Sequence, residues 1–409
     1  MNHTSNIQIP AKKEINVFRF LLSEMKPKIK IFTFFNVLTF PIIVAGLAII
    51  VYRFMHGLES VTNLSQDVPW GIWKAFNVVV GVAMAGGAYV LVFITHVLHV
   101  KKYEPVLKIA VLNGLLAYIF YSAALILELG RPLDIFNVII GNNFGVSSIL
   151  FLVAWHFLLY ILCLFLEFSP SIAAWLNARK LHKLLTGLTL VAVVFGITLS
   201  VLHQAGIGAL FTLASGKVHP LWYNQYLPLM FVMQSVFGGL SLVVVMVVIS
   251  WKVFKNQLSE KMKKAKNNIL IGMAGISGVG IFSYLFMAMI IFIHEKNWVY
   301  LGTGWGSWYL FEMVPFVFLP MLIFIYSYKM KNVNMSIVAS ALTLIGILLN
   351  RLNISLIAYN IDAVVRYIPT WQELTVSVSI ILIQIWVFRW IILRMPVLRD
   401  GPEWAKNKH

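Results

Sequence analysis

The sequence is poor in charged residues. Only 11% of its 409 residues are Asp, Glu, Lys or Arg, whereas 60% are hydrophobic and the mean hydropathy is +0.85. A soluble protein of this length needs far more polar surface to cover its core. The composition therefore excludes a soluble globule and indicates an integral membrane protein.

Cysteine is nearly absent, and the single thiol, Cys163, lies inside an apolar run. One thiol cannot form an internal disulfide, and it cannot supply the four thiolates of an iron–sulfur cluster. Any such cluster must therefore belong to a partner protein. Acidic residues are also few, 15 against 32 basic ones, which gives a net charge of +17. In a soluble chain this excess would suggest nucleic-acid binding.

Long apolar segments, by contrast, are frequent. A helix needs about 20 residues to cross a hydrocarbon core of about 30 Å. Ten segments meet this condition, at residues 31–53, 71–98, 106–127, 146–168, 184–211, 221–251, 268–293, 307–328, 333–357 and 372–393. We predict an all-α polytopic membrane protein in which ten transmembrane helices fill residues 31–394. Residues 1–30 form a cytoplasmic N-terminal segment and residues 395–409 a cytoplasmic C-terminal tail.

The basic residues orient this topology, because Lys and Arg accumulate in cytoplasmic loops. With the N-terminus inside, 25 of the 32 fall on the cytoplasmic side and 7 on the outer side. No cleavage site follows the first span, so the basic N-terminus is not a signal peptide. We expect both termini in the cytoplasm of a bacterium or archaeon, with the chain in the cytoplasmic (inner) membrane. The basic residues of the cytoplasmic loops orient the chain and attract anionic lipid, which explains the net charge. Nucleic acid is therefore excluded as a partner.

Polar side chains gather at one depth. Each ionisable group near the bilayer centre costs at least about 2.5 kcal/mol, so its position is informative. Counting about 1.5 Å per residue from the nearest loop, six spans bring polar or aromatic groups to the outer leaflet: Trp70, Trp73, Glu128, Arg131, His203, Gln204, His219, Trp222, Glu312, Asn350, Arg351 and Asn353. Unrelated structural residues would scatter over both leaflets, and the inner half holds fewer. The pattern therefore predicts a site at the outer face.

Several of these residues also have simpler interpretations. Trp residues at span ends are usually interfacial anchors. Glu128 and Arg131 in "LELGRPLDIF" can pair with each other at a helix end, and His203 can be a core histidine bonded to a carbonyl. Glu312 is the strongest candidate, because it lies inside a span and has no cation nearby in the sequence.

Carboxylates, imidazoles and aromatic rings at this depth suit a quinone. Its ring packs against Trp or Tyr, a His or Arg binds a carbonyl oxygen, and a carboxylate moves protons. A b-type haem is the rival cofactor, but it needs imidazoles at matched depth on facing helices, and His203 and His156 differ in depth. A transporter with a midplane site and a purely structural anchor are two further interpretations of the same spans.

The motifs, taken in order, resemble the polysulfide reductase/NrfD superfamily, and within it the HybB-type integral membrane subunits of [NiFe] hydrogenase 2. They are "PWGIWKAFNVVVGVAMAGGAY", "ELGRPLDIF", "LSVLHQAGIGALF", "HPLWY", the Glu before "VPFVFLP", "NRLNISLIAYN" and "RYIPTWQEL". "LGRP" alone is a weak signal, but the ordered set is specific and covers nearly the whole chain. The resemblance implies two four-helix bundles, spans two to five and six to nine, flanked by the first and last spans.

The resemblance also implies a function. The chain is expected to be the quinone-reactive membrane anchor of a respiratory oxidoreductase, non-catalytic alone, with menaquinone or ubiquinone as substrate. Electrons would pass between an extracytoplasmic iron–sulfur subunit and the quinone pool, with no haem or cluster in this chain. A [NiFe] hydrogenase is the favoured complex. Multihaem-cytochrome and sulfur or molybdopterin complexes carry the same type of subunit, and a haem b cytochrome stays the alternative.

Site roles follow from this expectation. Glu312 and His203 are predicted to exchange protons with the quinone, while Arg131 and Arg351 hold charge and contact the partner. No metal site is predicted. The predicted quinone-binding residues are Trp70, Trp73, Glu128, Arg131, Gln204, His219, Trp222, Arg351 and Asn353.

Overall fold

The computed structural model describes residues 17–65, 70–137, 145, 147–363 and 366–405. In these residues ten helices are long and apolar enough to span a membrane, which confirms the ten predicted spans. Several are built from more than one segment. The spans are α2 (Phe34–His56); η2 (Trp73–Gly81), α3 (Val82–Ala85), α4 (Gly87–Val92) and η3 (Phe93–Val97); η4 (Lys101–Tyr103) with α5 (Glu104–Leu127); α7 (Ile149–Trp175); α8 (Arg179–Thr212); α9 (Leu227–Val253); α10 (Glu260–His294); α11 (Gly304–Met313), η8 (Val314–Phe318) and α12 (Leu319–Met330); α13 (Val333–Leu352) with η9 (Asn353–Ile357); and α14 (Trp371–Arg394).

The sixth span begins later than predicted. Helix α9 begins at Leu227 rather than near residue 221, with Pro228 in its first turn, where proline is well tolerated. The residues before it form turns instead, so His219 and Trp222 lie on a connection and not inside a span. The backbone N–H of His219 donates to the Ala358 carbonyl oxygen at 2.9 Å, and this bond holds the connection against the end of the ninth span.

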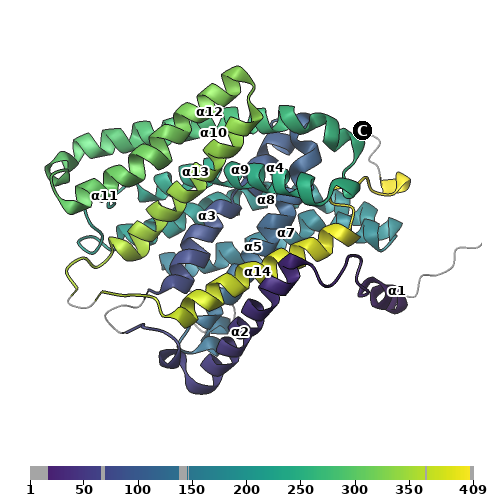
Figure 1. The fold of residues 1–409 in the computed structure, drawn as a ribbon, viewed down its shortest axis with the longest axis horizontal. Helices are drawn as coiled ribbons and strands as arrows, with labels where there is room; N and C mark the ends of the chain where they lie inside the picture. The colour runs from purple at the N-terminus through teal and green to yellow at the C-terminus, as the bar shows by residue number, and fades with distance from the viewer. Residues whose placement is uncertain (1–16, 66–69, 138–144, 146, 364–365, 406–409) are drawn as a thin grey trace, which may run out of the picture.

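The helices pack as two groups with a flanking pair. Spans two to five (η2 to η3, α5, α7 and α8) contact one another, and so do spans six to nine (α9 to η9). Helices α2 and α14 run side by side along the first group, where α14 packs on α5 (Figure 1). The arrangement agrees with the expected two four-helix bundles flanked by the first and last spans.

Small residues join the two bundles. Helix α9 packs on α3, α4 and α8. A Cβ atom added to Gly86 would lie 2.7 Å from the carbonyl oxygen of Ser235, and one on Gly87 would collide with the backbone of Gly239. Close approach of this kind favours small residues because transmembrane helices associate through packing.

Both ends of the described chain lie at the same end of the molecule, as an even number of spans requires. Figure 1 shows α1 (Val17–Glu24) and the C-terminal segment on the same side. The Arg394 guanidinium, at the end of α14, donates to the Lys26 carbonyl oxygen at 2.8 Å. We name this the inner end, following the predicted orientation, and name the end that carries Glu128 and His219 the outer end.

Four segments of the spans are π-helices, η2, η3, η8 and η9. Such segments are rare, and they are frequent at functional sites because the wider turn redirects the side chains around it. Three of them begin at or beside polar candidates. Segment η2 begins at Trp73, η8 begins two residues after Glu312, and η9 begins at Asn353.

Candidate functional site

Glu312 is the centre of a closed hydrogen-bond network in the second bundle. Its side chain is only 1% exposed. Its Oε2 accepts from Trp222 Nε1 at 2.8 Å and from Asn353 Nδ2 at 2.6 Å, and its Oε1 accepts from Asn350 Nδ2 at 2.7 Å. No cation forms an ion pair with it in the described chain. The carboxyl group can therefore gain or lose a proton without breaking a salt bridge.

Further partners fix the orientation of the two asparagine amides. Gln234 Nε2 donates to the Asn350 amide oxygen at 2.7 Å, and Trp308 Nε1 donates to the Asn353 amide oxygen at 2.9 Å. Because each amide oxygen is already engaged by a donor, each NH₂ group is turned toward Glu312. The carboxylate thus receives donors from the α13–η9 span and from the connection before α9, while α9 and α11 hold the two asparagines.

Aromatic rings cover the outer side of this network. The ring of Trp222 meets those of Trp305 and Tyr309 nearly edge to face, at centroid distances of 5.9 and 5.6 Å. The His219 ring lies 5.2 Å from that of Trp305. Burial lowers the pKa of His219, and its Nδ1 accepts from the Leu221 N–H at 3.2 Å. Both observations indicate a neutral imidazole that keeps its proton on Nε2.

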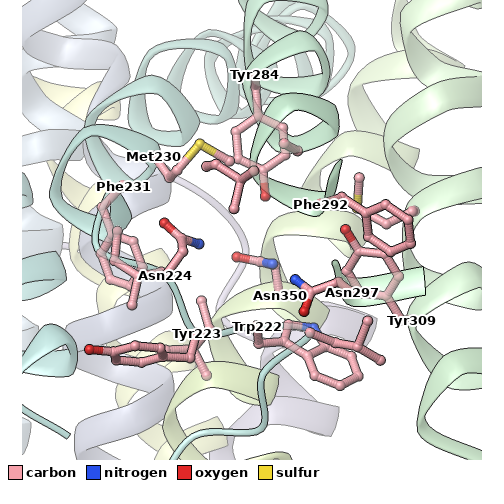
Figure 2. Close-up of a pocket in the computed structure, with 16 residues that line it drawn as sticks. Trp222, Tyr223, Asn224, Met230, Phe231, Tyr284, Phe292, Asn297, Tyr309 and Asn350 are labelled. Atoms are coloured by element: carbon pink, nitrogen blue, oxygen red, sulfur yellow. The ribbon is translucent and has the colours of Figure 1, made fainter. Parts of the chain in front are cut away.

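A small cavity adjoins the network. Figure 2 shows Trp222, Asn350 and Tyr284 around it, with Asn297 and Tyr309 at the side. Its volume is about 40 Å³. This is room for a few water molecules but not for a quinone ring, since a cavity that binds benzene measures about 150 Å³.

Glu128 belongs to a different cluster, at the start of the second span. Its two oxygens accept from the backbone N–H groups of Gly71, at 2.9 Å, and Lys74, at 2.7 Å. The Lys74 ammonium lies 3.4 Å away. Burial raises the pKa of Glu128, while Lys74 and the two N–H groups oppose that rise. The carboxylate caps the first turn of this span. It forms no ion pair with Arg131, which is exposed.

The two predicted tryptophans of the second span accompany Glu128. Trp73 is buried, and its Nε1 donates to the Glu373 carbonyl oxygen at 2.9 Å, which ties the second span to α14. Trp70 is half-buried, with its ring 5.4 Å from that of Phe211. Neither tryptophan has a hydrogen bond or ring contact with Glu312 in the described structure. Their position fits a structural role at the outer end of the first bundle.

His203 and Gln204 form a third cluster, on α8 inside the first bundle, and both are 0% exposed. His203 Nδ1 lies 3.3 Å from the Val153 carbonyl oxygen, and its ring packs on that of Phe157 at 4.9 Å. Gln204 Nε2 donates to the Val82 carbonyl oxygen at 3.0 Å. The other ring nitrogen, His203 Nε2, has no hydrogen-bond partner among the described residues. Gln204 Oε1 makes no hydrogen bond of ordinary geometry, although Gln204 interacts with the Tyr118 hydroxyl.

More unpartnered polar atoms continue from this cluster through the first bundle. We name the set the polar column. In the described structure it comprises buried polar atoms that make no hydrogen bond of ordinary geometry, on Asn77, Tyr118, Tyr160, Glu167, Ser200, His203 and Gln204. Within it, Tyr118 interacts with Ser200 and Gln204, and Tyr160 interacts with Ser200. The column extends from η2 at the outer end to Glu167, eight residues before the inner end of α7. Buried polar groups are normally hydrogen-bonded, so water or a ligand is the expected completion.

The histidines bear on haem, the rival cofactor. The ring of His203 is enclosed by Phe157 and by Tyr118, whose ring centroid is 5.7 Å away. His156 lies on α7, the direct neighbour of α8. Bis-histidine haem needs imidazoles that face each other across the macrocycle, and the rings packed around His203 leave no space for one at this histidine. The described residues also contain no group of three or more His, Cys, Asp or Glu placed to hold a metal ion.

Arg351 is fully buried, with 0% exposure, between the bundles. Its Nη2 donates to the Phe231 carbonyl oxygen at 3.0 Å, and its guanidinium lies 3.3 Å from the centroid of the Phe231 ring. Its Nε and Nη1 have no partner among the described residues. Because Arg351 does not reach the surface, the partner contact expected of it is not available in this structure. Arg131 alone stays a candidate for that contact.

The structure therefore divides the predicted site. It brings together the side chains of His219, Trp222, Glu312 and Asn353, places Trp70, Trp73 and Glu128 in the capping cluster, and places His203 and Gln204 in the polar column. Glu312 and His203, the two predicted proton carriers, share no hydrogen-bond or ring partner in the described chain.

Sequence reasoning missed several members of these clusters, chiefly Gln234, Tyr284, Trp308 and Glu167. Gln234 in "FVMQSVFGG" and Glu167 in "FLEFSP" each interrupt an apolar run. The cost of burying a polar group in a membrane applies to both as it does to Glu312, and that signal was sufficient to find them.

Residues 60–361 match the family model described as "Polysulphide reductase, NrfD". The chain belongs to the NrfD family. This match contains every predicted site residue from Trp70 to Asn353, whereas α14 lies outside it.

Relatives of this NrfD-family chain include a protein of Nitratidesulfovibrio vulgaris that is 36% identical over 91% of this chain and 96% of its own length. A relative in Escherichia coli, named as a probable Ni/Fe-hydrogenase 2 b-type cytochrome subunit, is 29% identical over 90% of this chain and 93% of its own. A third, from Archaeoglobus fulgidus, is named as the integral membrane subunit of an Hdr-like menaquinol oxidoreductase. It is 23% identical over 65% of each chain.

Proposed function

We propose that this chain is the quinone-reactive membrane subunit of a respiratory oxidoreductase. It would exchange electrons between an iron–sulfur partner at the outer end and the membrane quinone pool. The observation that carries the proposal is the buried Glu312 carboxylate, held by three N–H donors without a cation. Membership of the NrfD family and the names of the relatives support it. We favour a [NiFe] hydrogenase as the complex, because the hydrogenase-named relative covers nearly the full length of both chains.

Reduction of a quinone takes two electrons and two protons. The chain has one thiol and no cluster of its own, so the electrons come from the partner. Glu312 is the group that transfers a proton to or from a quinone oxygen. The fixed donors on Trp222, Asn350 and Asn353 stabilise its ionised form between transfers. The adjoining water-sized cavity lets the carboxyl group exchange protons with the outer side.

The quinone ring reaches this carboxyl group from the lipid side. Phe292 of α10 and Tyr309 of α11 stack with centroids 6.0 Å apart and planes 9° apart, and both are half-buried. Tyr309 in turn contacts Trp222, the donor to Glu312. Because the cavity is too small for the ring, we infer that the headgroup takes the place of the Tyr309 ring in this stack. Aromatic stacking is then retained while a quinone oxygen approaches Glu312.

His203 and Arg351 are both buried, and each has a proposed role in the reaction that needs no access to the surface. His203 Nε2 has no partner among the described residues and is available for the second proton. Arg351 is a buried cation with two unpartnered nitrogens, and it would offset negative charge on the reduced ring or on Glu312. Arg131 is exposed at the outer end and is the proposed contact with the iron–sulfur partner.

The experiment is to tag this chain, purify it with its partners, and assay electron transfer to decylubiquinone and to a short-chain menaquinone with H₂ as donor. We expect reduction of at least one quinone and no Soret absorption from this subunit. Reduction of viologen but of no quinone would contradict the quinone role. Quinone reduction with a donor other than H₂ would keep the quinone role and overturn the assignment to a hydrogenase. A Soret band that stays with this subunit would favour the cytochrome alternative.

A further inference from the structure

A second cavity lies at the inner end, far from the Glu312 network. Its volume is about 860 Å³. Its walls come from α1, the segment after it, and the inner ends of α7, α9 and α14, closed by the segment after α9 and by Arg399 near the C-terminus. The quinone chemistry proposed above does not use any of these residues.

The charge in this cavity is strongly one-sided. Five cations line it and a single carboxylate, Glu24, opposes them; the cations are Lys28, Lys252, Lys255, Arg394 and Arg399. Glu24 is already engaged, because its Oε1 lies 2.9 Å from the Lys28 ammonium and its Oε2 lies 3.8 Å from Arg394 Nε. The cavity therefore keeps a surplus of positive charge.

The two arginines of the cavity are held by backbone carbonyl oxygens. The Arg394 guanidinium is buried and donates to the carbonyl oxygens of Glu24, at 2.6 Å, and Lys26, at 2.8 Å. Arg399 donates to the Arg394 carbonyl oxygen. Lys252 and Lys255, by contrast, form no hydrogen bond or ion pair with any residue that the structure describes. These two ammonium groups stay available to an anion.

The cavity also has an apolar lining. The rings of Phe20 and Trp175 pack with centroids 5.3 Å apart, and Ile29, Val253 and Leu393 add to this apolar surface. A soluble anion would gain nothing from such a wall. A ligand with phosphate groups and hydrocarbon chains uses both sides, and basic pockets between transmembrane helices at this depth are typical lipid headgroup sites.

We propose that this cavity binds an anionic phospholipid with two phosphates, of the diphosphatidylglycerol class. The phosphates lie against Lys252, Lys255 and Arg399, and acyl chains run along Phe20 and Trp175. Two phosphates match the surplus of cations, and the volume far exceeds what one phosphate needs. The bound lipid links α1 to the inner ends of α9 and α14.

The test is native mass spectrometry of the detergent-purified full chain, titrated with tetraoleoyl cardiolipin, dioleoyl phosphatidylcholine or inorganic pyrophosphate. The variant is Lys252→Gln with Lys255→Gln. Its matched control is Lys180→Gln with Lys183→Gln, which removes two exposed inner-end lysines outside the cavity. Each lysine near an anionic headgroup contributes roughly fivefold in affinity, so the cavity variant should weaken cardiolipin binding about thirty-fold. The control should bind as the wild type does.

Three results would overturn the proposal. Equal weakening in both double variants would assign the affinity to general positive charge. Phosphatidylcholine that binds as tightly as cardiolipin would remove the role of the cations. Pyrophosphate that competes as well as the lipid would identify a site for a soluble anion. The single reversal Lys255→Glu is a second variant at an exposed position, and it should also weaken cardiolipin binding.

Discussion

Glu312 of the second bundle and the polar column of the first bundle differ in how their polar atoms are bonded. In the second bundle, both oxygens of Glu312 have donors, and the amides that donate to them are themselves held. In the first bundle, at least one polar atom of each of the seven residues of the polar column lacks a hydrogen bond of ordinary geometry in the described structure. Both regions carry the rare π-helical segments.

The difference separates two kinds of polar interior. A carboxylate whose two oxygens are both bonded keeps one geometry and is preorganised for proton transfer at one atom. A row of unbonded groups is stable only when other molecules complete it, and water is the smallest that can. The second bundle therefore has the features of a reaction site, and the first has those of a hydrated path that leads toward Glu167.

Replacement of Glu312 by Gln should have the largest effect. The amide cannot transfer a proton. Its NH₂ group is itself a donor, so it faces at least one of the three donors without forming a hydrogen bond. We expect quinone turnover by the purified complex to fall at least about 100-fold, which is the usual contribution of a general acid or base. Electron transfer from the donor to viologen should be unchanged. Exposed Glu295→Gln at the same end is the control, and an equal loss in that variant would point to a defect in partner docking.

Replacement of Arg351 by Met separates stability from function. The guanidinium has one hydrogen bond and no carboxylate partner in the described chain, and an apolar side chain of similar volume is often neutral or stabilising at such a position. We expect an unchanged or higher melting temperature, with a KM for quinone raised about tenfold because a stabilising charge is lost. A lower melting temperature with an unchanged KM would make Arg351 a structural residue.

A double-mutant cycle tests whether the two bundles act independently. His203→Phe keeps the ring packed against Phe157 but removes the unpartnered Nε2, and Trp222→Phe removes one donor to Glu312. Each should lower turnover about tenfold. Because the two residues share no partner in the described structure, their effects should multiply in the double variant. A double variant no slower than either single one would show that both residues serve the same step.

The smallest effect is expected for Glu128→Gln. The amide keeps one acceptor for the N–H groups of Gly71 and Lys74 but loses the ion pair with Lys74. Loss of a helix cap costs about 1 kcal/mol in free energy of unfolding, which in a chain of this size lowers the melting temperature by about 2 °C or less. Turnover should not change. A large loss of turnover at normal stability would move Glu128 from the capping cluster to the reaction site.

Much of the fold was predictable, because the cost of exposing polar backbone to lipid favours helices for long apolar segments. Ten such segments were predicted, and the described structure has ten. The predicted start of the sixth span was wrong. The residues around Trp222 are apolar and aromatic like those of a span, but they form turns between Pro220 and Pro228.

The site was harder to predict than the fold. Depth placed Glu312, His203 and Arg351 at a common level, but depth does not state which bundle a side chain faces. Interfacial glutamates look alike in sequence, and only the structure distinguishes Glu128 as a helix cap from Glu312 as the centre of a network. Gln234 was overlooked although its amide interrupts an apolar run.

The most direct test of Glu312 is redox-induced infrared difference spectroscopy of the purified complex, with quinone reduced and reoxidised. The expected result is a band in the carboxylic acid C=O region that appears or shifts with quinone reduction, disappears in Glu312→Gln, and persists in Glu295→Gln and Glu128→Gln. A difference spectrum in which this band survives the loss of Glu312 would contradict the proposal that this carboxyl group exchanges the proton.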